Sequence, residues 1–209
     1  MFAHLRRSHG AKALHNGGLI FWRVALGLRK VPLLDRDLEA LNHGVDEMPE
    51  EVDFTAAESR DEDGIRLTHL TYQNSLGEKV PAIRMLPLER SEEKLPGVVC
   101  IPGTSGAAEK VADPVFAEGE QIRGFGRELA RRGYATLAIS IKGTVGRRRY
   151  LELWEQEAKF LVAYGRPQMG FIAEEAIRAA RVLAACEGID SGRIGLTGMS
   201  LGGLATWYP

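Results

Sequence analysis

The chain has 209 residues, of which 44% are hydrophobic and 26% charged, values that are ordinary for a globular protein with a substantial buried core. Its formal net charge of −1 gives no overall attraction to nucleic acid, and its two cysteines, Cys100 and Cys186, match neither a disulfide framework nor a zinc site. We therefore expect one main domain with buried, reduced cysteines in a cytoplasmic protein, with no metal, no cofactor and no nucleic-acid partner.

The amino-terminal part differs from the rest in charge. Residues 1–34 carry six basic residues and no acid, whereas residues 35–63 hold twelve acids against two arginines. The apolar run NGGLIFWRVALGL contains Arg23 and is too short to span a bilayer, so we expect no transmembrane segment. A transit peptide or a membrane-surface helix is an alternative. We favour a helical or linker extension over residues 1–60, followed by the main domain over residues 61–209.

Regular structure is expected from residue 64 onward. The stretch IRLTHLTYQNSLGEKVPAIRMLPL alternates apolar and polar residues on both sides of a turn signal at residues 74–77. Alternation with a period of two is typical of strands that bury one face. The stretch therefore predicts an antiparallel β-hairpin.

Three short apolar runs follow, and two helical patterns separate them. VVCIPG, YATLAIS and GRIGLTG predict strands buried on both faces, while AEGEQIRGFGRELARRG and MGFIAEEAIRAARVLAACEG repeat apolar residues at helical spacing. This alternation predicts an α/β fold with a mainly parallel, doubly wound sheet, helices on both faces and an amino-terminal antiparallel hairpin. The active site of such a sheet lies at the carboxyl ends of its strands.

A glycine-flanked serine follows the last of these strands. Gly198 to Gly202 fit the pattern G-x-S-x-G, in which a strained turn between strand and helix projects the serine hydroxyl above the sheet. Gly198 and Gly202 would be needed there because the turn leaves no room for side chains. We interpret Ser200 as a nucleophile; the alternative is a glycine turn with an idle serine.

A serine nucleophile also needs hydrogen-bond donors for the oxyanion that develops during the reaction. The backbone N–H of Leu201, directly after the serine, is one candidate. The loop IPGTSG after the first parallel strand supplies the other, and Thr104 is the residue whose N–H we expect there. The alternative is a turn that binds no ligand.

Together, VVCIPGTSG, GRELARRGYATLAIS and GFIAEEAIRAARVLAACEGIDSGRIGLTGMSLGG resemble the α/β-hydrolase superfamily, and within it the branch of dienelactone hydrolases, acetylxylan esterases and prolyl oligopeptidase-like enzymes. The resemblance covers about residues 64–203 and implies a serine hydrolase that acts on small-molecule carboxylic esters. Two positions depart from the family pattern. Pro102 stands where many members have a histidine. Residues 140–143, which follow the predicted strand YATLAIS, lack the acid that many relatives carry there.

The catalytic triad departs further from the family order, which is serine, then acid, then histidine. No acid or histidine follows Ser200, and the five histidines stand upstream at positions 4, 9, 15, 43 and 69. We therefore expect a hydrolase domain truncated after the nucleophile turn, inactive alone, with an exposed sheet edge that an oligomer or partner covers. A non-catalytic α/β-hydrolase-like protein that binds a ligand or partner is the alternative. A reading frame that continues beyond Pro209 with an acid and a histidine favours the first interpretation.

The segment after the second parallel strand is basic and then aromatic. In SIKGTVGRRRY the glycines and four basic residues are compatible with a site for a substrate carboxylate, although such loops are usually only solvated. The segment LELWEQEAKFLVAYGRP comes next. In the related enzymes such segments form a wall of the acyl pocket, so Trp154 and Tyr164 are candidates for pocket residues. Glu174 and Glu175 are not a catalytic pair, because adjacent helical residues point in different directions.

Overall fold

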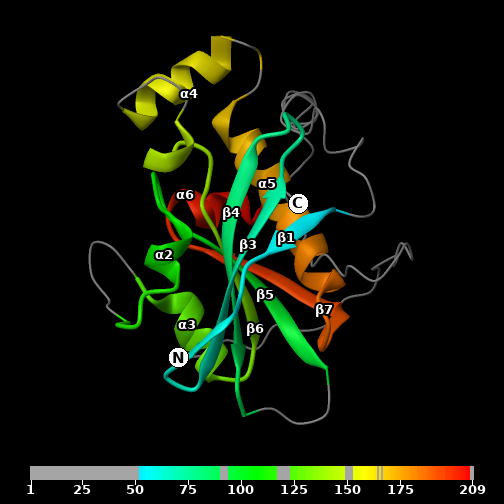
Figure 1. Cartoon of the computed structure of the whole chain (residues 1–209). Coiled ribbons are helices and arrows are strands. Elements are labelled where there is room, and N and C mark those ends of the chain that lie inside the picture. Colours follow the sequence, from blue (N-terminus) through cyan, green and yellow to red (C-terminus); the bar gives the residue numbers. More distant parts are fainter. Residues whose placement is uncertain are drawn as a thin grey trace, which may run out of the picture.

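The computed structural model describes residues 52–89, 94–116, 123–148, 153–163, 165 and 167–207. The described strands form one seven-stranded sheet, flanked by helices, in the order β1-β3-β4-β6-β5-β7, with β2 paired to β3 (Figure 1). The strands are β1 (Phe54–Ala56), β2 (Arg60–Glu62), β3 (Ile65–Gln73), β4 (Lys79–Pro87), β5 (Leu95–Ile101), β6 (Ala135–Ile139) and β7 (Ile189–Gly198). The helices are α2 (Ala108–Val111), α3 (Phe125–Arg131), the 3-10 helix η1 (Val145–Arg147), α4 (Trp154–Ala163), α5 (Gln168–Ala185) and α6 (Leu201–Ala205). The predicted α/β class is confirmed.

The predicted hairpin is formed by β3 and β4, which pair antiparallel along their whole length. Its turn depends on Asn74, whose side-chain oxygen accepts hydrogen bonds of 3.0 Å from the backbone N–H groups of Leu76 and Glu78. Gly77 has a φ of 72°, a left-handed conformation that favours glycine. The sequence signal for this turn was therefore correct.

The sheet extends further toward the amino terminus than we predicted. β1 and β2 lie in the acidic stretch that looked linker-like, and both pair antiparallel with β3. Each has only three residues, and most of these are exposed. Short edge strands of this kind protect a sheet edge from unwanted pairing, and the three residues of β2 are all charged. Neither strand is long enough to show the apolar alternation by which a strand is recognised in a sequence.

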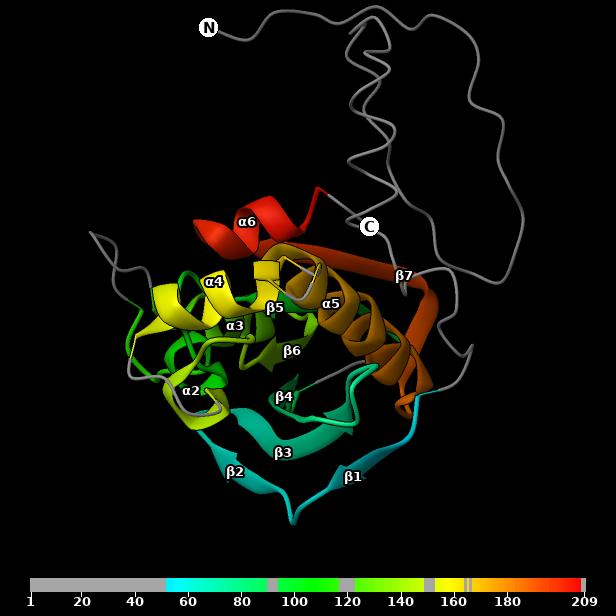
Figure 2. The same cartoon turned by 90° about the horizontal axis from the view of Figure 1, so that it is seen from above.

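The sheet is mixed. β5 lies between β6 and β7 and runs parallel to both, whereas β4 pairs antiparallel with β6. Figure 2 shows β7 at one edge and β1 and β2 at the opposite one. The parallel trio β6-β5-β7 ends together at one side of the sheet. The loops that follow these three strands therefore become neighbours in space.

The two faces of the sheet carry separate cores, because successive strand residues point in opposite directions. Val99 and Ile101 join the larger core beneath α5, while Cys100 between them joins a smaller core beneath α2 and α3. Figure 1 shows α5 on one side of the sheet and α2 with α3 on the other. Helices on both faces are thus confirmed, whereas α4, which packs on α5, was not predicted.

Both cysteines are buried and neither forms a disulfide, as their positions in the sequence predicted. Burial raises the pKa of the Cys100 thiol above its usual value, so the group behaves as a small apolar side chain. Within the described ranges, no helix combines the length and apolarity that crossing a membrane requires.

One buried hydrogen bond connects the hairpin to α5. The Tyr72 hydroxyl donates to the carbonyl oxygen of Glu175 at 2.7 Å, across 103 residues of sequence. Burial, reinforced by the negative charge of Glu175, raises the pKa of this phenol well above its ordinary value. The hydroxyl therefore remains protonated at neutral pH and can donate this hydrogen bond.

We expect Tyr72→Phe to lower the free energy of unfolding by about 1–2 kcal/mol, because a buried carbonyl loses a partner. Urea denaturation measures the change. Tyr134→Phe is the matched control, since this tyrosine is 38% exposed and the same substitution there should cost less than about 0.5 kcal/mol. Equal losses in the two variants would contradict a structural role for the Tyr72 hydroxyl.

Candidate active site

The turn between β7 and α6 holds Ser200 in a strained backbone conformation. Its φ of 52° and ψ of −119° lie in a region that residues other than glycine rarely adopt, at a cost of order 1–3 kcal/mol. Two hydrogen bonds close the turn: Gly202 N–H donates to the Met199 carbonyl at 2.9 Å, and Leu204 N–H donates to the Ser200 carbonyl at 3.0 Å. The Ser200 side chain is exposed. The turn thus presents one hydroxyl above the end of β7.

The two flanking glycines allow backbone to touch backbone. A Cβ atom at Gly202 would lie less than 3.0 Å from the carbonyl oxygens of Ile101 and Pro102, and one at Gly198 would meet the backbone of Gly202 equally closely. Atoms of the backbone cannot move aside as the tip of a side chain can. The Ser200 turn therefore packs directly on the end of β5, where Met199 N–H also donates to the Ile101 carbonyl at 3.1 Å.

Residues 103–106, after β5, form a second tight turn, which we call the Thr104 turn. Gly106 N–H donates to the Gly103 carbonyl at 2.8 Å, and Ser105 has a φ of 57°. A positive φ at the third position is characteristic of type II turns, in which the N–H of the second residue is not used for closure. Thr104 is that second residue, and its side chain is exposed.

The structure brings the Thr104 turn and the Ser200 turn into contact. A Cβ atom at Gly103 would lie 3.0 Å from the terminal methyl of Met199, so the residue before the serine covers the glycine before Thr104. Leu201 is the first residue of α6, and the first N–H groups of a helix have no acceptor within it. The Ser200 turn and the Thr104 turn are thus neighbours. The backbone N–H groups of Leu201 and Thr104 are not used to close either turn.

The only histidine in the described part of the chain is remote from Ser200. His69 lies exposed on β3, and β4, β6 and β5 separate it from β7. Four steps of about 4.8 Å place it roughly 19 Å away along the sheet. The histidines at positions 4, 9, 15 and 43, like Tyr164, lie outside the described residues. The described residues also contain no group of three or more side chains suited to hold a metal ion.

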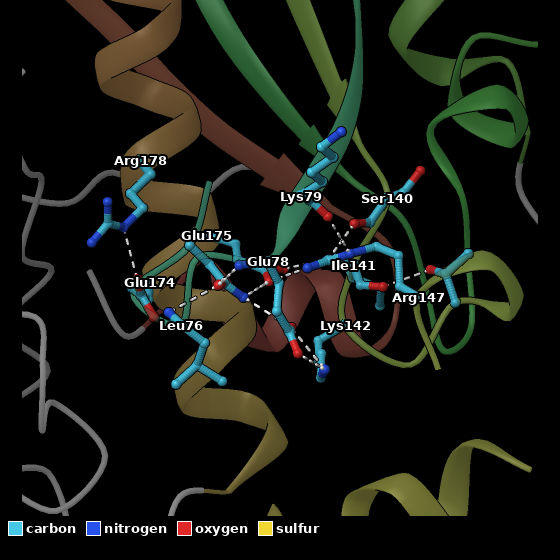
Figure 3. Close-up of polar contacts among 12 residues, drawn as sticks. Leu76, Glu78, Lys79, Ser140, Ile141, Lys142, Arg147, Glu174, Glu175 and Arg178 are labelled. Atoms are coloured by element: carbon cyan, nitrogen blue, oxygen red, sulfur yellow. Dashed lines mark hydrogen bonds and ion pairs between the residues drawn. The ribbon is translucent and has the colours of Figure 1, made fainter. Parts of the chain in front are cut away.

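Sequence reasoning missed a buried network of charged residues at this end of the sheet (Figure 3). The Lys142 ammonium lies 2.8 Å from Glu78, and the Arg147 guanidinium lies 2.6 Å from Glu175. The Lys142 ammonium also lies 3.1 Å from Glu157 of α4. Burial opposes the charge on Arg147, but its hydrogen bonds and ion pair with Glu175 outweigh burial and raise the pKa of the guanidinium. The network therefore consists of paired charges within the fold.

The two adjacent glutamates of α5 have different partners. Glu175 binds Arg147 and Asn74, while Glu174 accepts from Arg178 at 2.7 Å and from the backbone of Ser75. They are therefore not a catalytic pair. Of the basic loop, Arg147 is used by Glu175, and Arg148 donates to the Gly143 carbonyl at 2.7 Å and to the Ser105 hydroxyl at 3.2 Å. These contacts give both arginines a structural role.

No family model and no curated protein matches the sequence significantly. Solved structures do match the fold. A candidate acetyl xylan esterase of Bacteroides fragilis has a TM-score of 0.62 at 17% identity, over 82% of this chain and 48% of its own. An acetyl xylan esterase of a Thermoanaerobacterium species has a TM-score of 0.60 at 17% identity, over 82% and 53%. A methylesterase has a TM-score of 0.57 at 20% identity, over 82% and 36%.

The chain thus spans about half the length of the first two structures and about a third of the methylesterase. Each of these matches covers 82% of this chain, and these structural neighbours are esterases. At such low identities the match establishes the fold alone. The chain has the fold of α/β-hydrolase-type esterases, and the resemblance expected from its sequence is confirmed at that level.

Proposed function

We propose that this chain carries the nucleophile and the oxyanion donors of a serine carboxylic-ester hydrolase. Ser200 is the nucleophile, and the backbone N–H groups of Leu201 and Thr104 bind the oxyanion. The observation that carries the proposal is the backbone conformation of Ser200, because a strained serine held between two contacting backbones has no evident structural purpose. Strain of this kind is concentrated at functional sites.

The proposed reaction has two stages. The Ser200 oxygen attacks the ester carbonyl carbon while a base takes its proton, and the carbonyl oxygen becomes an oxyanion bound by the two amides. Collapse of this intermediate expels the alcohol, which receives the proton, and leaves an acyl group on the serine. Water then attacks the acyl carbon while the base takes a proton from it, which forms a second oxyanion. Its collapse breaks the bond to the Ser200 oxygen, which regains the proton, and releases the carboxylic acid.

The base of this reaction is not among the residues described. In α/β-hydrolases the acid and the histidine follow the serine in the chain, and residues 201–209 contain neither. Lys142 does not substitute for them, because its ammonium is buried between Glu78 and Glu157. The proposal therefore assigns the base to polypeptide outside the described residues.

We expect Ser200→Ala, in the complete gene product that contains this sequence, to reduce kcat/KM for p-nitrophenyl acetate by about 10³-fold or more. The hydroxyl that forms the acyl-enzyme is then missing. Ser191→Ala is the matched control, because Ser191 is also exposed and lies on β7, near the opposite end of the strand from the Ser200 turn. The assignment is wrong if the Ser200 variant keeps normal turnover.

The role of Thr104 is testable because only proline removes a backbone N–H. Thr104 is the second residue of its turn, a position that accepts proline in type I and II turns. We expect Thr104→Pro to lower kcat by about 10²–10³-fold, the loss typical of one oxyanion donor. Thr104→Ala keeps the amide and should retain near-normal kcat. Equal kcat values in the proline and alanine variants would remove Thr104 from the oxyanion site.

The isolated 209-residue chain should turn over p-nitrophenyl acetate at the background rate, because none of its described residues places a base beside Ser200 and no histidine follows the serine, so the hydroxyl keeps its proton and is a poor nucleophile. Among the described strands β7 pairs only with β5, and none of them pairs with its other edge. We propose that a further strand or a partner covers this edge, so the isolated chain should associate in solution. Assays beside Ser200→Ala and light scattering test both points. A monomer with multiple, Ser200-dependent turnovers would contradict them.

A further inference from the structure

The Thr104 turn is held from two sides. On one side lies the Ser200 turn, through the contacts of Met199 with Gly103 and of Gly202 with the end of β5. On the other lies the loop after β6, residues 140–148, which we call the β6 loop. Because β5 is the middle strand of the parallel trio, its loop has a neighbour on each side.

Two hydroxyl groups of the β6 loop hold the backbone of the β5 loop. Thr144 Oγ1 lies 2.6 Å from the carbonyl oxygen of Gly106, the residue that closes the Thr104 turn. Ser140 Oγ accepts a hydrogen bond of 2.9 Å from the backbone N–H of Ala108. Both hydroxyl groups are buried, so water does not compete for these contacts.

The Thr144 hydroxyl bridges two loops. It also lies 2.6 Å from the Ile141 carbonyl of its own loop, and a hydroxyl has a single proton to donate at any moment. The Thr144 backbone is independently fixed, because its N–H donates to the Ile141 carbonyl at 3.1 Å and its carbonyl accepts from Arg147 N–H at 2.8 Å. The side chain thus projects from a closed turn to the Gly106 carbonyl.

The β6 loop is itself tied to the rest of the protein. Arg147 donates to the Ser140 carbonyl at 2.7 Å and pairs with Glu175 of α5, as Figure 3 shows. Gln168, also of α5, donates to the Lys142 carbonyl at 2.6 Å. Anchored by buried ion pairs and hydrogen bonds, the loop can act as a rigid support for the neighbouring turn.

We propose that Thr144 is a positioning residue of the active site, which aims the Thr104 amide at the oxyanion by holding the Gly106 carbonyl. This inference rests on the proposed function, because it presumes that the Thr104 amide is an oxyanion donor. Donors contribute to catalysis through their preorganised placement, and a displacement of about 1 Å can cost about 10²-fold in rate. The effect therefore falls on kcat, with little effect on ground-state binding.

The test compares Thr144→Val and Thr144→Ser in the complete gene product. Thr144→Val keeps the shape but removes the hydroxyl, and it should lower kcat for p-nitrophenyl acetate about 10- to 100-fold with KM nearly unchanged. Thr144→Ser restores the hydroxyl and should recover most of kcat. Thr144→Ala gives the same comparison should the valine variant not fold.

Thr136→Val is the matched control. Thr136 is another buried threonine and lies on β6, the strand before the β6 loop. Its hydroxyl donates to the Gly126 carbonyl of α3 at 3.1 Å, away from the site. It should lose as much stability as Thr144→Val and keep kcat. A normal kcat in Thr144→Val, or an equal loss of kcat in both valine variants, would overturn the positioning role.

Amide hydrogen exchange separates this inference from the proposed function. We expect the Gly106 and Ala108 amides to exchange about two- to tenfold faster in Thr144→Val than in Thr136→Val, as loss of one hydrogen bond implies. Unchanged exchange overturns the support of the turn by Thr144 whether or not the protein is an esterase. Retained turnover in Ser200→Ala together with faster exchange would instead reject the proposed function while leaving the support in place.

Discussion

The contact between Gly202 and the end of β5 determines the geometry at the carboxyl ends of the parallel strands. Because Gly202 has no side chain, the backbone of the Ser200 turn rests on the carbonyl oxygens of Ile101 and Pro102. That contact fixes the height of Ser200 above the sheet and brings Met199 over Gly103. A single methyl group at position 202 would separate the two backbones. The serine and the Thr104 turn would then no longer share one surface.

Buried charges on the β6 loop and α5 support the same carboxyl ends of the strands from the other side. Desolvating isolated ions is costly, and each ion here has an opposite charge within hydrogen-bond distance, as for Arg147 with Glu175. These pairs join elements that are distant in sequence: the hairpin turn, the β6 loop, α4 and α5. Ion pairs require defined geometry, whereas apolar contacts tolerate sliding. The network is thus suited to fixing loops at one set of positions.

Local patterns predicted the elements that build the site but not their order. The apolar runs of β5, β6 and β7, the hairpin turn at Asn74 and the glycines around Ser200 are all signals within a few neighbouring residues. The placement of β6 between β4 and β5 depends on pairings between residues about 40 to 60 positions apart, which no local pattern records. Glu157, Glu174 and Lys142 were hidden for a related reason. A charged residue is expected at the surface unless its partner is known. Arg178, which pairs with Glu174, is a neighbour on the same helix, but the partners of Lys142 and Glu157 lie on other elements, 15 or more residues away along the chain.

The support beneath Ser200 also affects the order in which the protein assembles. About a hundred residues separate Ile101 from Gly202, and β5 itself needs β6 as a neighbour before it is buried. On a ribosome that adds about 5–20 residues per second, the Ser200 turn emerges several seconds after β5. No contact compensates the strain at Ser200 until the carbonyl groups at the end of β5 are in place. The turn consequently cannot take its final conformation on the growing chain before the end of β5 is in place.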